Sequence, residues 1–392
     1  MLEIKNKIEC TGCYACYNAC PTKAIILVED KEGFKYPKID KEKCINCGKC
    51  ERVCPVFNKN LKNENRVKPV VMAAWSKNED IRVDSTSGGI FSELAKKVLQ
   101  EQGIVVGALY TKDWKVEHAI ITKENEIEKI RSSKYLQSDI NDTYIKVEEY
   151  LKKNIKVLMC GAPCQIAGLY NYLNKEYENL ITCDFICRGV NSPKVFKMYI
   201  KHLEQKYKSK VKNIKFKNKK HGWHNFSTKI DFENGKTYIG GRYTDSYMIG
   251  YLQHNAFIRP SCYECKFKGV PRKADITLGD FWGIEKIDKN LDNNKGTSIV
   301  MLNNEKAEEF FTSLKDNIFY QRIESEQVYK HNVCANNSVK MTKEREEVFE
   351  NIDIMSYEEL SKKYFKEPNM YKKIKIKIRE SKIGRLIKGK KY

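Results

Sequence analysis

The sequence predicts a mixed α/β protein, α+β overall, with a small cysteine-rich domain in front of a larger domain built on a mixed sheet. A cysteine pattern occurs twice within the first 57 residues, and the chain after it alternates short apolar strands with helices. A basic, partly helical pattern after residue 327 predicts a C-terminal tail. We therefore expect domains at 1–57, 69–155 and 156–327, the last two being parts of one domain, with a linker at 58–68 and a tail at 328–392.

The N-terminal domain contains two copies of C-x2-C-x2-C-x3-C-P, at residues 10–21 and 44–55. Four thiolates hold a cubane 4Fe-4S cluster, and in two-cluster ferredoxins the last cysteine of each run binds the other cluster. Zinc knuckles and disulfide frameworks also use paired cysteines, but structural zinc sites favour separated C-x2-C pairs. The repeat therefore predicts two 4Fe-4S clusters, one held by Cys10, Cys13, Cys16 and Cys54 and the other by Cys44, Cys47, Cys50 and Cys20.

The rest of the N-terminal domain predicts a hairpin between the two cysteine runs. Residues 24–29 and 34–39 are short and apolar-rich, and residues 30–33 between them are typical of a turn. Residues 58–68 are polar and aperiodic, as a linker would be.

The larger domain alternates predicted strands and helices. The strand-loop-helix units favour an α/β sheet, and Asn234-Gly235 predicts a hairpin turn. Strands are expected at 70–75, 104–110, 115–121, 156–160, 180–187, 211–216, 227–232, 236–239 and 297–302, and helices at 90–100, 142–153, 194–207, 245–256 and 305–314. A further helix is expected after the loop at 161–165, and it ends near residue 172.

The segment DSTSGG at 84–89 comes just before a predicted helix. Backbone N–H groups at such a helix start can bind a phosphate, but an ordinary N-cap followed by a turn has the same composition. The residues alone favour the N-cap and turn.

A third group of cysteines lies in the larger domain. Cys164 and Cys187 each follow a predicted strand, and Cys262 and Cys265 form a C-x2-C pair. If the two strands are parallel neighbours, both thiols emerge at one edge of the sheet, where ligands collect in α/β folds. The four thiols are then compatible with a third cubane. Packing is expected for Cys160 and Cys183, which lie within apolar strands, and no role is predicted for Cys334.

The net charge of +21 would ordinarily suggest a nucleic-acid partner. Anionic clusters reduce this total, and the lysines are scattered among Asn and Glu as on a solvated surface, so no nucleic-acid partner is expected. The sequence shows no apolar signal segment and no apolar run of membrane-spanning length. A cytoplasmic location is therefore expected, where thiolates remain available to iron.

The C-terminal residues 371–392 hold ten Lys or Arg against one Glu, with isoleucines at mixed spacings. The spacing favours neither a strand nor an amphipathic helix. A solvated tail is expected, with weak contact to an acidic partner or an anionic membrane surface as the alternative.

Several segments of the larger domain resemble the family of coenzyme F420 hydrogenase/dehydrogenase beta subunits. They follow the two-cluster unit in one order, and the resemblance covers residues 10–314. The segments are STSGG at 85–89, SKYLQS at 133–138, GAPCQIAGL at 161–169, DFICRGVNSP at 184–193, RPSCYECKFK at 259–268 and ADITLGDFWGI at 274–284.

The resemblance implies an FAD-containing α/β domain with a 4Fe-4S cluster of its own. Many bacterial relatives have His at the position of Arg188, so no proton-transfer role is carried over to it. The implied ligands of the third cluster are Cys164, Cys187, Cys262 and Cys265. Ser87, Gly88 and Gly89 are implied to line the flavin phosphates, and Ser133, Lys134, Tyr135 and Gln137 match a polar motif near the flavin.

Because a cubane transfers one electron and a flavin accepts one or two, the sequence predicts an iron–sulfur flavoprotein oxidoreductase. Electrons would pass between ferredoxin or a redox partner subunit, the clusters, FAD and an unknown small-molecule substrate. No catalytic residue is assigned. The alternative is a non-catalytic electron-transfer subunit that serves a separate enzyme, for example in surface-polysaccharide metabolism.

Overall fold

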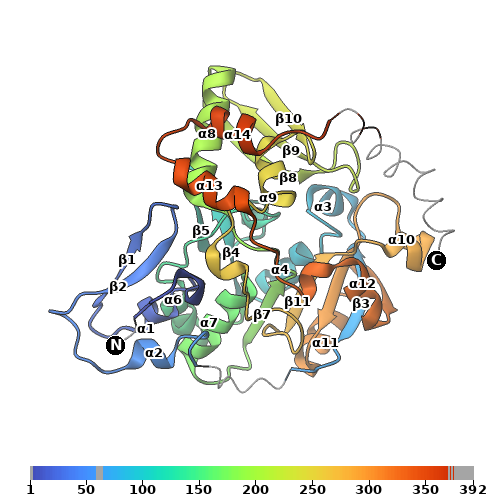
Figure 1. The fold of residues 1–392 in the computed structure, drawn as a ribbon. Helices are drawn as coiled ribbons and strands as arrows, with labels where there is room; N and C mark the ends of the chain where they lie inside the picture. Colours follow the sequence, from blue (N-terminus) through green and yellow to red (C-terminus); the bar gives the residue numbers. More distant parts are fainter. Residues whose placement is uncertain (1–2, 59–64, 370, 372–373, 375–392) are drawn as a thin grey trace.

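The computed structural model describes residues 3–58, 65–369, 371 and 374, and its centre is an eight-stranded mixed sheet (Figure 1). The strands are β3 (Val70–Ser76), β4 (Ile104–Tyr110), β5 (Val116–Ile121), β6 (Val157–Cys160), β7 (Leu180–Phe185), β11 (Ile276–Asp280), β12 (Ser298–Leu302) and β13 (Ile318–Ile323). Their order is β13-β3-β12-β11-β7-β6-β4-β5. The strands β11, β7, β6 and β4 run parallel, and every other pairing in the sheet is antiparallel. The fold is therefore the predicted mixed-sheet α/β class.

Helices cover both faces of this sheet because its strands are apolar on both sides. On β6, Leu158 belongs to one core, and Val157 and Met159 belong to the core on the opposite face. The first core is completed by α4 (Ile90–Gln100), α5 (Ile127–Ile130) and α11 (Glu305–Thr312). The opposite one is completed by α6 (Thr143–Lys152) and α7 (Pro163–Leu173).

The N-terminal residues form a separate small lobe beside α6 and α7 (Figure 1). Its hairpin pairs β1 with β2 in antiparallel register, as predicted, and its first helix packs against α7. Ala15 and Ala19 are buried on that helix, and their small side chains let it approach α7 closely. The elements are η1 (Lys7–Glu9), α1 (Ala15–Ala19), β1 (Ile25–Glu29), β2 (Lys35–Ile39) and α2 (Lys49–Arg52).

A second sheet of three antiparallel strands lies away from the first, in the order β10-β9-β8 (Figure 1). It shares one apolar core with four helices, two of which come from the C-terminal part of the chain. The strands are β8 (Val211–Asn218), β9 (Ser227–Phe232) and β10 (Thr237–Gly241), and the helices are α8 (Pro193–Tyr207), α9 (Ser246–Leu252), α13 (Lys343–Asn351) and α14 (Tyr357–Tyr364). The predicted turn at Asn234-Gly235 connects β9 to β10, and Gly235 has the positive φ of 81° that such a turn requires.

Some elements differ from the sequence prediction. The strands β11 and β13 were not predicted, and the helix predicted at 245–256 ends at Leu252. The chain leaves that helix for Asn255, which has a positive φ of 51°. The other short elements are α3 (Glu79–Asp84), η2 (Glu124–Glu126), η3 (Pro260–Cys262), α10 (Ile284–Ile287), η4 (Lys289–Leu291), α12 (Ser325–His331) and η5 (Val333–Ala335).

The region predicted as a helical tail contains packed helices. Val348 of α13 and Leu360 of α14 are fully buried in the core of the second sheet. The basic segment at 371–392 lies almost entirely outside the described residues. Among the helices that the structure describes, none combines the length and the apolar character needed to cross a membrane.

Candidate functional site: three cysteine cavities

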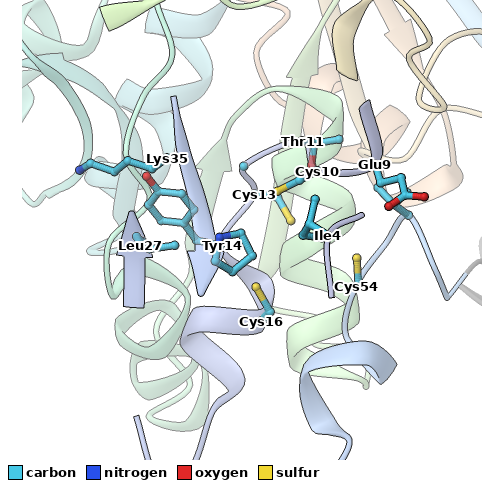
Figure 2. Close-up of a pocket in the computed structure, with 13 residues that line it drawn as sticks. Ile4, Glu9, Cys10, Thr11, Cys13, Tyr14, Cys16, Leu27, Lys35 and Cys54 are labelled. Carbon is cyan, nitrogen blue, oxygen red and sulfur yellow. The ribbon is translucent and has the colours of Figure 1, made fainter. Parts of the chain in front are cut away.

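The first cavity brings together cysteines from both copies of the repeat (Figure 2). It measures about 410 Å³, and Figure 2 shows the sulfur atoms of these cysteines around a common space. Three of the cysteines come from the loop that leads into α1 and from α1 itself, and the fourth follows α2. The lining cysteines are Cys10, Cys13, Cys16 and Cys54.

The backbone of the first loop allows this arrangement. Gly12 has a φ of 69°, and a Cβ at this position would lie 2.2 Å from Gln137 Nε2. Tyr14 precedes α1 in the left-handed region with a φ of 61°. Its hydroxyl donates to Asp139 Oδ1 at 2.6 Å, which anchors the loop to the larger domain.

Burial disfavours the thiolate form of two cysteines in the first cavity, Cys13 and Cys16. Burial raises the pKa of Cys13 to about 12, and the charge of Cys54 adds to the increase. Burial and the charge of Cys13 raise the pKa of Cys16 well above its ordinary value. Bound iron would stabilise thiolates in such a site, so cluster binding would release protons.

The second cavity is lined by the remaining four cysteines of the repeat and measures about 380 Å³. Cys47 is exposed to solvent. Although burial opposes the change, hydrogen bonds from Thr22 and from the Ala24 N–H lower the pKa of Cys20. The lining cysteines are Cys20, Cys44, Cys47 and Cys50.

Both cavities combine three cysteines of one run with the last cysteine of the other run. This is the crossed grouping that the spacing predicts. Each donor set is four thiols around a space of similar size, which suits two copies of one tetrahedral thiolate cofactor.

The third cavity, of about 590 Å³, is lined by cysteines of the larger domain. β6 and β7 are parallel neighbours, so the chain segments after them emerge at the same edge of the sheet. Cys164 is the second residue of α7, and Cys187 lies just after β7. Cys262 ends η3, and Cys265 follows it, so that all four cysteines line the one cavity.

The thiols of the third cavity interact with one another in a buried setting. Burial and the charge of Cys265 raise the pKa of Cys164 well above its ordinary value. Burial raises the pKa of Cys187 to about 11 and that of Cys262 to about 12. The Ser261 hydroxyl lines the same cavity and is buried without a hydrogen-bond partner among the described residues, so it can donate to an anionic group placed there.

The first and third cavities are adjacent. Thr11 lines both of them. One small apolar cluster, formed by Val56, Ala167 and Phe267, has Cys54, Cys164 and Cys265 packed against it. Gly168 lies one turn after Cys164 on α7, and a Cβ at Gly168 would lie 3.1 Å from the Sγ of Cys13.

The other three cysteines lie beside these sites. Cys160 and Cys183 are directly opposite each other in the register of β6 and β7, and Cys183 is fully buried in the core, as expected for packing. The Cys334 thiol is 3.9 Å from Nη1 of Arg188, whose Nη2 donates to Asn255 Oδ1 at 2.6 Å.

The predicted phosphate-binding segment lies where β3 meets α4. Ser87 donates its hydroxyl to the Thr297 carbonyl at 2.8 Å, and the Gly88 N–H donates to Ser298 Oγ at 2.9 Å. Gly88 also lies so close to β3 that a Cβ would be 2.4 Å from the Ala74 carbonyl oxygen. Gly89 is the N-cap of α4 and has a φ of 88°. These contacts match the interpretation of the segment as a turn and helix start.

The residues of the predicted polar motif lie in two places. The Ser133 hydroxyl is 3.4 Å from Thr86 Oγ1, which brings it to the start of the α4 segment. The Lys134 Nζ donates to the Arg131 carbonyl at 2.6 Å, and burial lowers the pKa of Lys134 to about 7. Tyr135 stacks edge-on against Phe216 of β8, with ring centroids 5.4 Å apart.

Gln137 lies beside the first cavity. Its Nε2 donates to the Gly12 carbonyl at 3.3 Å, and its Oε1 accepts from Arg259 Nη1 at 2.7 Å. Sequence reasoning assigned no role to Arg259. Only its place three residues before Cys262 marked it, and Arg259 reaches the first cysteine loop through contacts that no local pattern predicts.

Comparisons with known proteins agree with the cysteine geometry of the N-terminal lobe. Residues 9–58 match the 4Fe-4S dicluster domain. Residues 71–143 match the N-terminal part of the coenzyme F420 hydrogenase/dehydrogenase beta subunit, and residues 155–328 match its C-terminal part.

Individual relatives align with most of this chain. A subunit of the F(420)H(2) dehydrogenase of Methanosarcina mazei is 22% identical over 318 residues, covering 78% of this chain and 82% of that protein. An uncharacterized protein of Methanocaldococcus jannaschii is 24% identical over 341 residues, covering 79% and 87%. A solved structure, the F420-reducing [NiFe] hydrogenase complex from Methanosarcina barkeri, aligns with 80% of this chain and 94% of its own at 17% identity and a TM-score of 0.46.

Proposed function

The chain belongs to the family of coenzyme F420 hydrogenase/dehydrogenase beta subunits and carries a 4Fe-4S dicluster domain in front, and we propose that it is an iron–sulfur flavoprotein oxidoreductase. It exchanges electrons with ferredoxin or a redox partner subunit and with a small organic substrate. We propose that it works in the reducing cytoplasm, where its thiols remain available to iron.

One observation carries this proposal: a cavity lined by Cys164, Cys187, Cys262 and Cys265 adjoins the first cavity of the dicluster domain. Four thiols around one cavity, none of them in a disulfide, are the donor set of a third 4Fe-4S cluster. Its position extends the dicluster domain into the larger domain. Such an extension is what an electron path to a reaction site requires.

Bound clusters supply one-electron transfer, and FAD would supply two-electron chemistry. The chain's own residues hold and shield these groups. Thiolates of the three cavities would ligate iron, and the Ser261 hydroxyl would donate a hydrogen bond to a group held in the third cavity. Lys268 donates from Nζ to the carbonyls of Cys187 and Cys334, which fixes the loop after β7 over the cavity.

At the proposed flavin position, some of the groups that could bind an anion are free and others are already hydrogen-bonded within the protein. The N–H groups of Gly89 and Ile90 at the start of α4 have no partner among the described residues, and they are the groups that would meet a phosphate. The hydroxyl of Ser87 and the N–H of Gly88 are already used within the protein. The proposal therefore assigns flavin phosphate contact to the Gly89 and Ile90 backbone.

Cofactor content tests the proposal. After anaerobic reconstitution with iron, sulfide and FAD, the full chain should hold about 12 iron atoms and about one FAD. About 8 iron atoms with no flavin would contradict the third cluster and the flavin, and would instead favour a non-catalytic electron-transfer subunit.

A pair of cysteine variants tests the third cavity itself. Cys265→Ala should lose about four iron atoms, because its thiol lines the cavity. Cys334→Ala is the matched control, since Cys334 is nearby but does not line the cavity, and it should keep the full iron content. Equal iron content in the two variants would reject this ligand set.

A further inference from the structure

A buried cation lies between the first and third cavities. Arg259 is 0% exposed. Its Nε donates to the Cys10 carbonyl at 2.8 Å, and its Nη2 lies 3.6 Å from Cys10 Sγ. The other donors reach Gln137 Oε1 at 2.7 Å and the Lys35 carbonyl at 3.0 Å. The guanidinium is therefore held against a ligand of the first cluster from several directions.

Aromatic rings enclose the rest of this guanidinium. Its central carbon lies 4.4 Å from the centroid of the Tyr36 ring and 5.3 Å from that of Phe34. Both rings belong to the N-terminal hairpin region, whereas Arg259 belongs to the larger domain. The ring faces exclude water and leave the charge in a region of low dielectric constant.

Two other buried arginines, Arg272 and Arg345, differ from Arg259 in one respect. Arg272 pairs with Asp184 at 3.0 Å, and Arg345 pairs with Glu32 at 2.5 Å. Within the described part of the chain, no carboxylate lies within ion-pair distance of Arg259. A buried charge without a counterion is costly, so an anionic group has to compensate for it. The thiolate of Cys10 on a negatively charged cluster is the group that its contacts select.

We propose that Arg259 is the countercharge of the first cluster, and that it raises the reduction potential of this cluster above that of the second. Reduction adds a negative charge to the cluster, and a fixed cation 3.6 Å from a ligand sulfur stabilises the reduced form. At the second cavity, the lining cation is the exposed Lys49, whose charge is screened by water. This inference rests on the dicluster domain and is independent of the third cluster and of FAD.

A redox titration followed by EPR tests the role of Arg259 in the full, anaerobically reconstituted chain. The wave of the first cluster is the one that disappears in Cys16→Ser. At the wild-type midpoint of that wave, Arg259→Gln should lower the ratio of reduced to oxidised cluster about tenfold, which is about 59 mV for a one-electron couple. Arg259→Lys keeps the charge and should stay close to the wild-type midpoint.

Arg345→Gln is the matched control, because Arg345 is also buried but has a carboxylate partner. It should lower the melting temperature and leave the first-cluster midpoint unchanged. Loss of the first cluster from Arg259→Gln together with its retention in Arg259→Lys at the wild-type midpoint also supports the countercharge. An unchanged midpoint in Arg259→Gln, an equal shift in both variants, or loss of the first cluster from both would overturn the proposal.

Discussion

The first and second cavities are lined by cysteines of identical sequence spacing, yet the protein surrounds them differently. In the first cavity, Cys13 is buried, and the guanidinium of Arg259 lies against Cys10. In the second cavity, Cys47 is exposed, and the adjacent Ile45 is 65% exposed. The larger domain covers one copy of the motif and leaves the other copy at the surface.

This difference separates two properties of a cluster site. The repeated spacing decides which atoms bind iron, because a short loop has to wrap a cubane. The surroundings decide which partners reach the cluster and how strongly its reduced form is stabilised. The second site is therefore accessible from the surface, whereas the first site lies against the larger domain.

The largest expected effect is the loss of the first cluster when a cysteine of the second run is replaced. Cys54 lies in the second run but lines the first cavity, so Cys54→Ala should remove the first cluster, with a loss of about four iron atoms. Cys50→Ala is the matched control and should remove the second cluster. Iron analysis gives the loss, and chelator resistance identifies the survivor. A chelator-resistant cluster in Cys54→Ala would contradict the crossed arrangement.

The next effect concerns the ion pair that holds the N-terminal lobe against α13. Glu32, in the turn between β1 and β2, is buried and pairs with Arg345 of α13 at 2.5 Å. Glu32→Gln leaves that arginine uncompensated and should lower the free energy of unfolding by about 3–5 kcal/mol. Anaerobic urea unfolding measures the change.

Glu29→Gln serves as the control for this pair, because Glu29 is an exposed carboxylate at the end of β1. It should change the free energy of unfolding by less than about 0.5 kcal/mol. Equal stabilities for Glu32→Gln and Glu29→Gln would show that the ion pair does not hold the lobe in place.

A smaller effect tests the close approach of α7 to the first cluster. A Cβ at Gly168 would lie 3.1 Å from Cys13 Sγ. Alanine favours a helix interior over glycine by about 1 kcal/mol, but overpacking costs about 1–3 kcal/mol. We expect Gly168→Ala to lower the free energy of unfolding of the reconstituted chain. Gly241→Ala, at the end of β10 with its nearest neighbour 3.4 Å away, is the control. Stabilisation by Gly168→Ala would show that the contact is loose.

The smallest expected effect is a difference in the rates at which a chelator removes the two clusters from the unmutated chain. Because Cys47 is exposed and Cys13 is buried, an iron chelator should remove the second cluster faster than the first, by a factor on the order of tenfold. The loss of visible absorbance should then follow two phases. A single phase would mean that burial does not protect the first cluster.

Much of the fold follows from local pattern. The hairpin of the N-terminal lobe, the helices α4 and α8, and the strands β4 and β12 lie within one or two residues of their predicted ranges. Each has a clear period or a strong turn residue. β11 was missed because it is a short strand within a motif that was noted only for its family resemblance. The residues of β13 do not alternate between buried and exposed: its two ends are buried and its middle is exposed. Only its pairing with β3 identifies it as a strand.

The candidate site was predictable to the same degree. The cysteine spacing predicted the two crossed groups of thiols, and the strand ends predicted that Cys164 and Cys187 would lie at one edge of the sheet. Gln137 was grouped with the flavin motif, but it faces the first cysteine loop. No local pattern indicated what Arg259 contacts, because its partners lie more than a hundred residues away in the chain.

The sequence by itself predicted the family of the chain and the two groups of cysteines in the N-terminal lobe, because ligand spacing is a property of short backbone segments. Only the tertiary structure decided that one cluster site is covered and the other exposed, that the first cavity adjoins a third group of thiols, and that a buried guanidinium lies between them. Burial and charge interactions act through space. They therefore depend on residues such as Arg259 and Gly168, which folding alone brings to Cys10 and Cys13.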